Sequence, residues 1–125
     1  MDVTKKFSAK IEGDFIHLKT WGELKTEDLH DPVDTAIELA KEKQITKLLD
    51  DIRDVDSANI SIPVQAKGLG MLWKLQHFKK VAIIFRGDEM GWMLTSSLEA
   101  MHIEFSSKIK GFRDEQSAIK WLAGN

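Results

Sequence analysis

Alternating apolar and polar residues predict that the chain opens with two strands. Apolar side chains occupy every second position in residues 7–11 and again in residues 16–18, and Glu12-Gly13-Asp14 lies between them. Alternation of this kind is typical of strands with one buried face. Because a short Gly-containing segment joins the two runs, the pattern predicts a β-hairpin.

The segment after the hairpin, residues 29–40, has the apolar spacing of a helix. Its apolar residues recur at spacings of three and four, which places them on one face of a helix. They are Leu29, Val33, Ala36, Ile37 and Ala40. The helix start has two candidates: Thr26 as N-cap before two acidic residues, or Asp31 as N-cap with Pro32 as the first helical residue. Either start gives a helix with one apolar face.

Three later segments are predicted as strands: residues 45–52, 79–86 and 108–112. The first two are apolar enough to be covered on both faces, as in a parallel sheet. The first runs directly into DDIRDVD, residues 50–56, which we expect to form a solvated acidic loop.

Helices are expected between and after these strands. Residues 64–78 and 90–105 repeat apolar side chains at helical spacing. In the closing helix, Asp114 is the expected N-cap and Gly124 lies just past the end. Its inward residues are Ala118, Ile119 and Leu122.

The resulting order, ββαβαβαβα, predicts an α/β sandwich with a mostly parallel central sheet and an N-terminal β-hairpin. With 125 residues, the chain has the length of a single domain, which we place at 1–125. Cysteine is absent, which excludes disulfides and thiolate metal sites and favours a cytoplasmic protein. The longest apolar run, residues 81–85, is far shorter than the roughly 20 residues of a membrane-spanning helix.

The net charge of −2 gives no reason to expect nucleic acid as a partner. Its distribution is uneven, because the stretch between Ser57 and Gly87 holds five basic residues and no acidic one. This basic stretch contains the segment GLGMLWKL, residues 68–75, which is apolar over a wider arc than one sheet face requires.

The wide apolar arc predicts a ligand cleft between the second and third helices. Its candidate ligand-binding residues are Leu69, Met71, Leu72, Trp73, Trp92 and Met93. The competing interpretation is that Trp73 and Trp92 are core residues. Lys67, Trp73 and Lys74 could also face an anionic membrane surface, so a peripheral membrane location is part of this hypothesis. An ordinary solvated lysine face is the alternative.

Metal and catalytic sites are not expected. Asp50, Asp51, Asp54 and Asp56 offer oxygen ligands, but they lack the Gly and terminal Glu of a calcium loop. The histidines show no metal-ligand spacing; they are His17, His30, His77 and His102. Because no phosphate-binding loop, nucleophile elbow or paired-acid motif is present, we expect no catalytic residue, no metal and no cofactor.

The chain resembles the SpoIIAA-like, STAS-type proteins along nearly its whole length. The matching positions are Gly22, Leu24, Thr26, Asp28 and Leu29, then FKKVAII at residues 78–84, and Trp92, Phe112, Ala118, Trp121 and Leu122. In the anti-sigma factor antagonists of this family, a serine after the acidic strand is phosphorylated and switches partner binding. The nearest positions here are Ser57 and Ser61, although the usual Asp-Ser-Ser-Gly-Leu run is missing.

The resemblance extends in fold to CRAL-TRIO domains, which hold an apolar ligand between sheet and helices. The first hypothesis is therefore a non-enzymatic domain that binds a small apolar or lipid-like ligand, at a membrane surface or in the cytoplasm. The alternative is a regulatory protein–protein interaction module of the anti-sigma factor antagonist type, switched by serine phosphorylation. Its partner would be a regulatory protein or a second copy of the chain.

Overall fold

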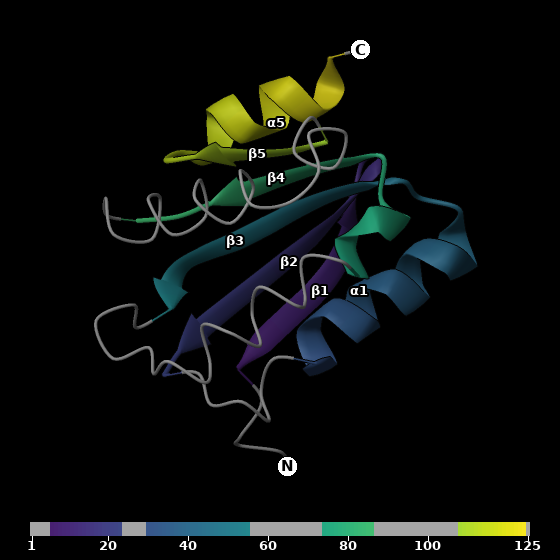
Figure 1. Ribbon diagram of the computed structural model, residues 1–125, viewed down its shortest axis with the longest axis horizontal. Helices are drawn as coiled ribbons and strands as arrows, with labels where there is room; N and C mark the ends of the chain where they lie inside the picture. Colours follow the sequence, from purple (N-terminus) through teal and green to yellow (C-terminus); the bar gives the residue numbers. More distant parts are fainter. Residues whose placement is uncertain (1–5, 24–29, 56–73, 87–107, 125) are drawn as a thin grey trace.

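The computed structural model describes residues 6–23, 30–55, 74–86 and 108–124 (Figure 1). Within them lie a five-stranded sheet, the helices α1 (His30–Lys43) and α5 (Glu115–Ala123), and a short 3-10 turn, η3 (Leu75–His77). The strands are β1 (Phe7–Glu12), β2 (Phe15–Gly22), β3 (Lys47–Val55), β4 (Lys80–Ile84) and β5 (Ile109–Phe112). Of the predicted helix over residues 64–78, only residues 74–78 are described, and the helix predicted over residues 90–105 lies outside the described residues.

The sheet has the order β1-β2-β3-β4-β5. β1 and β2 pair antiparallel, and Glu12 faces Phe15 across the turn at Gly13. Gly13 has a φ of +58°, a left-handed conformation that glycine adopts without steric cost. The pairs β2·β3, β3·β4 and β4·β5 are all parallel. The predicted hairpin and the mostly parallel sheet are therefore confirmed.

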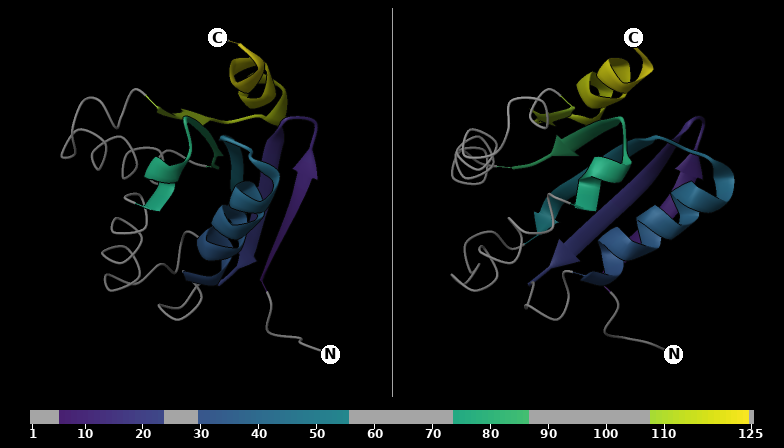
Figure 2. Two further views of the ribbon diagram at one scale, coloured as in Figure 1. Left: turned by 90° about the vertical axis from the view of Figure 1, so that its right-hand side faces the viewer. Right: turned by 45° about the vertical axis from the view of Figure 1, so that its right-hand side comes forward.

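Two hydrophobic cores lie on opposite faces of the sheet, with α1 against one and α5 against the other (Figure 2). We call them the α1-side core and the α5-side core. The buried residues of the α1-side core are Ile16, Leu18, Val33, Ala36, Ala40, Leu48, Leu75, Phe78, Val81, Ile83 and Ile109. Those of the α5-side core are Phe15, Leu49, Ala82, Ile84, Ala118 and Leu122. Successive strand residues alternate between the two sets, because side chains along a strand point to opposite faces.

The structure corrects the prediction of an acidic loop. β3 continues to Val55, and its residues as far as Asp54 and Val55 pair with Trp21 and Gly22 of β2. The segment 50–55 is therefore strand. Its charges are compatible with a strand because Arg53 binds the carboxylate of Asp51 on the same strand. A shift in register between Lys19 and Trp21 accommodates this extension.

One of the two candidate starts of the first helix and the end of the second helix are also wrong, while the other candidate start, Thr26, lies outside the described residues. His30 and Asp31 are both helical, so Asp31 is not an N-cap. At the other boundary, Phe78 has extended backbone angles, φ −91° and ψ 146°, and no longer belongs to a helix. The reason is local: the Phe78 N–H bonds back to the Leu75 carbonyl at 3.0 Å, and the next N–H, of Lys79, bonds to Thr46. The chain thus turns into the sheet before Phe78.

The ends of α5 agree with the prediction at both positions. The Asp114 carboxylate accepts a hydrogen bond from the Ser117 N–H at 2.8 Å, and Gly124 is the C-cap. The sequence did not predict a third contact. The Lys80 Nζ of β4 donates to the carbonyls of Trp121 at 2.7 Å and Gly124 at 2.8 Å, and lies 4.6 Å from the centroid of a Trp121 ring. A cation at a helix C-terminus satisfies carbonyls that lack intrahelical partners.

We expect Lys80→Met to lower the free energy of unfolding by about 1–2 kcal/mol, because it removes two charge-assisted hydrogen bonds at the end of α5. The matched control is Lys79→Met, since the neighbouring Lys79 is exposed and its change should cost no more than about 0.5 kcal/mol. Urea unfolding of both variants measures the difference. Equal losses would show that the Lys80 contacts add nothing to stability.

No helix in the described part of the chain is long and apolar enough to cross a membrane.

Candidate functional site

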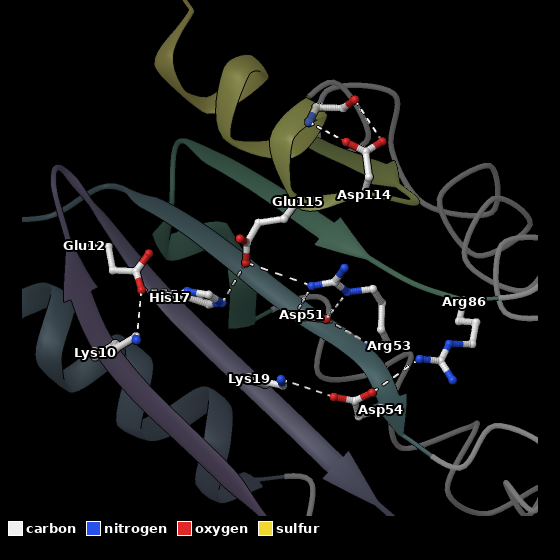
Figure 3. Close-up of polar contacts among 11 residues, drawn as sticks. Lys10, Glu12, His17, Lys19, Asp51, Arg53, Asp54, Arg86, Asp114 and Glu115 are labelled. Atoms are coloured by element: carbon white, nitrogen blue, oxygen red, sulfur yellow. Dashed lines mark hydrogen bonds and ion pairs between the residues drawn. The ribbon is translucent and has the colours of Figure 1, made fainter.

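The carboxyl ends of β2, β3 and β4 meet at one edge of the sheet, because these strands are parallel. Three charged residues gather there (Figure 3). The Asp54 carboxylate lies 3.2 Å from Lys19 Nζ and 3.5 Å from Arg86 Nη2. All three side chains are exposed, so these ion pairs contribute little to stability. They place an anion between two cations at the end of β3.

Asp51 and Arg53 form a closer pair on the same strand. The Arg53 Nε and Nη2 donate to the two Asp51 oxygens at 3.0 and 2.8 Å, and the Arg53 N–H donates to Oδ1 at 3.1 Å. The Asp51 side chain is 2% exposed. Burial alone would raise the pKa of Asp51, but the hydrogen bonds and charge of Arg53, aided by the charge of Lys19, hold this pKa below its ordinary value. Asp51 therefore stays ionised on the α5 side of the sheet.

Asp50 is adjacent in sequence but has the opposite environment. In the register of the sheet it lies opposite Leu18 of β2 and Ile83 of β4, both of which belong to the α1-side core. Burial raises the pKa of Asp50 to about 7, and the nearby charge of Asp51 adds to the increase. Near neutral pH this carboxyl group therefore exists in both protonation states.

His17 of β2 lies beside Asp51 on the α5 side of the sheet, between two glutamates. Its Nδ1 lies 3.1 Å from Glu12 Oε1, and its Nε2 lies 3.9 Å from Oε1 of Glu115, the first residue of α5. Lys10 contacts the same Glu12 oxygen at 3.0 Å. The Lys10 hydrogen bond, with a smaller contribution from His17, holds the pKa of Glu12 below its ordinary value. Arg53 Nη2 reaches Glu115 at 4.0 Å and joins this group to Asp51.

Most of the site residues predicted from the sequence lie outside the described residues. They are Leu69, Met71, Leu72, Trp73, Trp92 and Met93 for a ligand, Lys67 and Trp73 for a membrane, and Ser57 and Ser61 for phosphorylation. Lys74 is described, and its Nζ forms a 2.9 Å ion pair with Asp34 of α1. These predictions stay untested.

The aspartates expected in one loop do not share one environment. Asp50 and Asp51 point to opposite faces of β3, and Asp54 belongs to the carboxyl edge; Asp56 lies outside the described residues. The sequence indicated only that Arg53 could neutralise part of the acidic cluster, not that it pairs with Asp51, and it did not single out Glu115. The signal for Arg53 was available, because Asp51 and Arg53 are two positions apart and share one face of a strand. The approach of Glu115 to His17 had no such signal, since it depends on how α5 packs.

Comparisons with known proteins agree with this fold. The family model described as SpoIIAA-like matches residues 15–123. No curated protein matches the sequence. An uncharacterized DUF3478-family protein of Shewanella loihica PV-4, whose structure has a SpoIIAA-like fold, is 23% identical, with a TM-score of 0.59 over 94% of this chain and 92% of that one.

Two further solved structures are similar in fold. An anti-sigma factor antagonist from Mycobacterium paratuberculosis is 13% identical, with a TM-score of 0.62 over 94% of this chain and 93% of that one. The Bacillus cell fate determinant SpoIIAA in its phosphorylated form is 14% identical, with a TM-score of 0.55 over 93% and 98%. The comparisons do not show the expected relation to CRAL-TRIO domains or support a lipid ligand. The family match over residues 15–123 shows that the chain belongs to the SpoIIAA-like family.

Proposed function

We propose that the protein is a non-enzymatic regulatory module of the anti-sigma factor antagonist type, which binds a protein partner and is switched by phosphorylation of Ser57 or Ser61. Family membership supports this function, as do two structural neighbours, an anti-sigma factor antagonist and a protein solved in its phosphorylated form. The observation that carries the proposal is the arrangement of charges at the carboxyl edge of the sheet.

Both serines follow the end of β3 closely in the sequence. Ser57 is two residues beyond Val55, and two residues of chain span at most about 7 Å. A phosphate on Ser57 would thus be introduced near Asp54 and the two cations that Asp54 contacts, Lys19 and Arg86. The modification would then add its charge close to existing ion pairs, which supports the proposal.

Phosphorylation adds a charge of about −1.5 to −2 at neutral pH. Such a group repels the Asp54 carboxylate and attracts Lys19 and Arg86. Arg86 is the more available cation, because its side chain is 74% exposed and its 3.5 Å contact with Asp54 is long. Phosphorylation would therefore make the charge that this edge presents to a partner more negative.

The direct test measures binding to the purified anti-sigma factors of the source organism by isothermal titration calorimetry. We expect the wild-type protein to bind one of them, and Ser57→Asp or Ser61→Asp to weaken that binding by about tenfold or more, as a misplaced charge at an interface does. Ser57→Ala and Ser61→Ala should bind nearly as well as the wild type.

Gln44→Asp is the matched control, because Gln44 is exposed and precedes the amino end of β3, at the opposite edge of the sheet, and aspartate tolerates its positive φ. It should leave the affinity unchanged. The proposal fails if no anti-sigma factor binds, or if both aspartate variants bind as the wild type does. Circular dichroism of each variant excludes unfolding as the cause of lost binding.

A further inference from the structure

His17, Asp51 and Glu115 come from β2, β3 and the first turn of α5, and they converge on the α5 side of the sheet (Figure 3). One donor atom from each lies within 4.8 Å of the other two. Among the described residues, they form a group of one imidazole and two carboxylates, a donor set found in divalent transition-metal sites.

The environment of the His17 imidazole also points to a ligand. Its side chain is 11% exposed, both ring nitrogens are fully buried, and neither makes a well-aligned hydrogen bond despite the 3.1 Å contact with Glu12. A neutral imidazole has one N–H and one lone pair. Because carboxylate oxygens face both nitrogens, the lone pair necessarily faces another acceptor. A proton, the O–H of a water molecule or a metal ion would satisfy it.

The proximity of Glu12 to Nδ1 favours the tautomer with the proton on Nδ1. Histidine ligands commonly donate this other N–H to a carboxylate or carbonyl while the free nitrogen binds the metal. The free nitrogen would then be Nε2, on the side of Glu115. The Lys10 contact holds Glu12 ionised and ready to accept this hydrogen bond.

The presence of Arg53 is compatible with a bound cation for two reasons. It donates two hydrogen bonds to Asp51 Oδ1 but only one to Oδ2, so Oδ2 keeps a free lone pair. In addition, Asp51, Glu115 and Arg53 together carry a net charge of −1 when His17 is neutral. Arg53 then acts as the group that orients the Asp51 carboxylate from outside the ligand set.

We propose that His17 Nε2, Asp51 Oδ2 and the Glu115 carboxylate bind one divalent transition-metal ion of the Zn²⁺ class. Ligand atoms at about 2.0–2.2 Å from zinc are roughly 3.3 Å apart in a tetrahedral site. The present separations of up to 4.8 Å must therefore contract. Glu115 can supply this movement because its side chain is 44% exposed. The metal site is independent of the regulatory function proposed above.

The test is calorimetric titration of ZnCl₂ into the full chain after treatment with EDTA and desalting. We expect one Zn²⁺ per chain at micromolar affinity, and about tenfold or greater weakening in each of the variants His17→Gln and Glu115→Gln. The matched controls are His77→Gln and Glu42→Gln, which change an exposed histidine and an exposed glutamate outside the group. They should bind Zn²⁺ as the wild type does.

Nitrogen NMR shifts of the His17 ring provide the second measurement, since metal binding moves the Nε2 resonance at constant pH. The proposal is overturned if Zn²⁺ does not bind, if His17→Gln binds unchanged, or if the control variants lose affinity equally. The proposal is also overturned if both His17 nitrogens remain protonated in the presence of Zn²⁺, because a proton would then occupy the position assigned to the metal. If the His17→Gln variant does not fold, the Zn²⁺ affinity of the Glu115→Gln variant tests the proposal.

Discussion

Replacing Arg53 with methionine is expected to lower the free energy of unfolding by about 2–4 kcal/mol at pH 7. Removing one partner of a buried ion pair leaves the other charge desolvated and unpaired, at a cost of about 3–5 kcal/mol. We expect a somewhat smaller loss here because the Arg53 side chain is 32% exposed, although Asp51 is buried. Urea unfolding monitored by circular dichroism measures this loss.

The pH dependence identifies the cause. In the wild-type protein the pKa of Asp51 is lowered, so its stabilising contribution is present above the unfolded pKa near 3.8 and is lost as pH falls through the folded pKa. Without Arg53, burial dominates and raises the pKa of Asp51 above the unfolded value. The variant then gains stability as Asp51 becomes protonated, so its deficit should shrink between pH 7 and pH 4.

Arg86→Met is the matched control for Arg53→Met. Arg86 also contacts an aspartate, but it is 74% exposed, so its loss should cost no more than about 0.5 kcal/mol. The double variant Arg53→Met/Asp51→Leu should recover part of the lost stability, because no buried charge remains. If Arg53→Met costs no more than Arg86→Met, the pair with Asp51 is not a stabilising feature.

The second large effect is expected at Asp50. Its pKa is raised to about 7, so the folded state binds this proton more tightly than the unfolded state does. The protonated carboxyl is the form that the fold favours; stability is lost as pH rises above the unfolded pKa near 3.8, and the loss levels off above pH 7. Asp50→Asn removes this ionisation and should stabilise the protein most at alkaline pH.

From the pKa difference we expect a gain of about 4 kcal/mol at pH 8 and roughly 1–2 kcal/mol at pH 5. Any constant cost of placing an amide at this position lowers both values equally, so the difference between the two pH values is the quantity to measure. Asp54→Asn, at an exposed position of the same strand, should change stability by no more than about 0.5 kcal/mol at either pH. A gain at Asp50 that is equal at pH 5 and pH 8 would contradict the raised pKa.

Local patterns predicted the sheet well, because each strand carries its own signal. The hairpin follows from alternation and a glycine turn, and the last helix from Asp114 and Gly124 at its two ends. The prediction of a loop over residues 50–56 was wrong because the charged residues were assumed to be exposed to solvent. Residues 50–55 alternate between two environments, and Arg53 compensates the buried carboxylate on its own face. The charged residues of this ion pair therefore made the end of β3 resemble a solvated loop in the sequence.

The candidate sites were less predictable, for a physical reason. The charges at the carboxyl edge come from residues that end parallel strands, so Lys19, Asp54 and Arg86 were in principle accessible from the strand order. The group around His17 was not. Glu115 lies 98 positions after His17 in the sequence, and only the packing of α5 brings the two together. A search for metal-ligand spacing cannot find a site that tertiary packing assembles.

The two adjacent aspartates of β3 also determine which strand alignment the chain can adopt. Asp50 tolerates its apolar neighbours Leu18 and Ile83 because it can hold a proton near neutral pH, whereas Asp51 remains charged beside Arg53. A slip of β3 by one position would exchange the two faces of the strand. It would bury the charge of Asp51 among the apolar residues and direct Arg53 away from the α5 side. This dipeptide therefore discriminates against misaligned sheets, a selectivity that an all-apolar central strand would not possess.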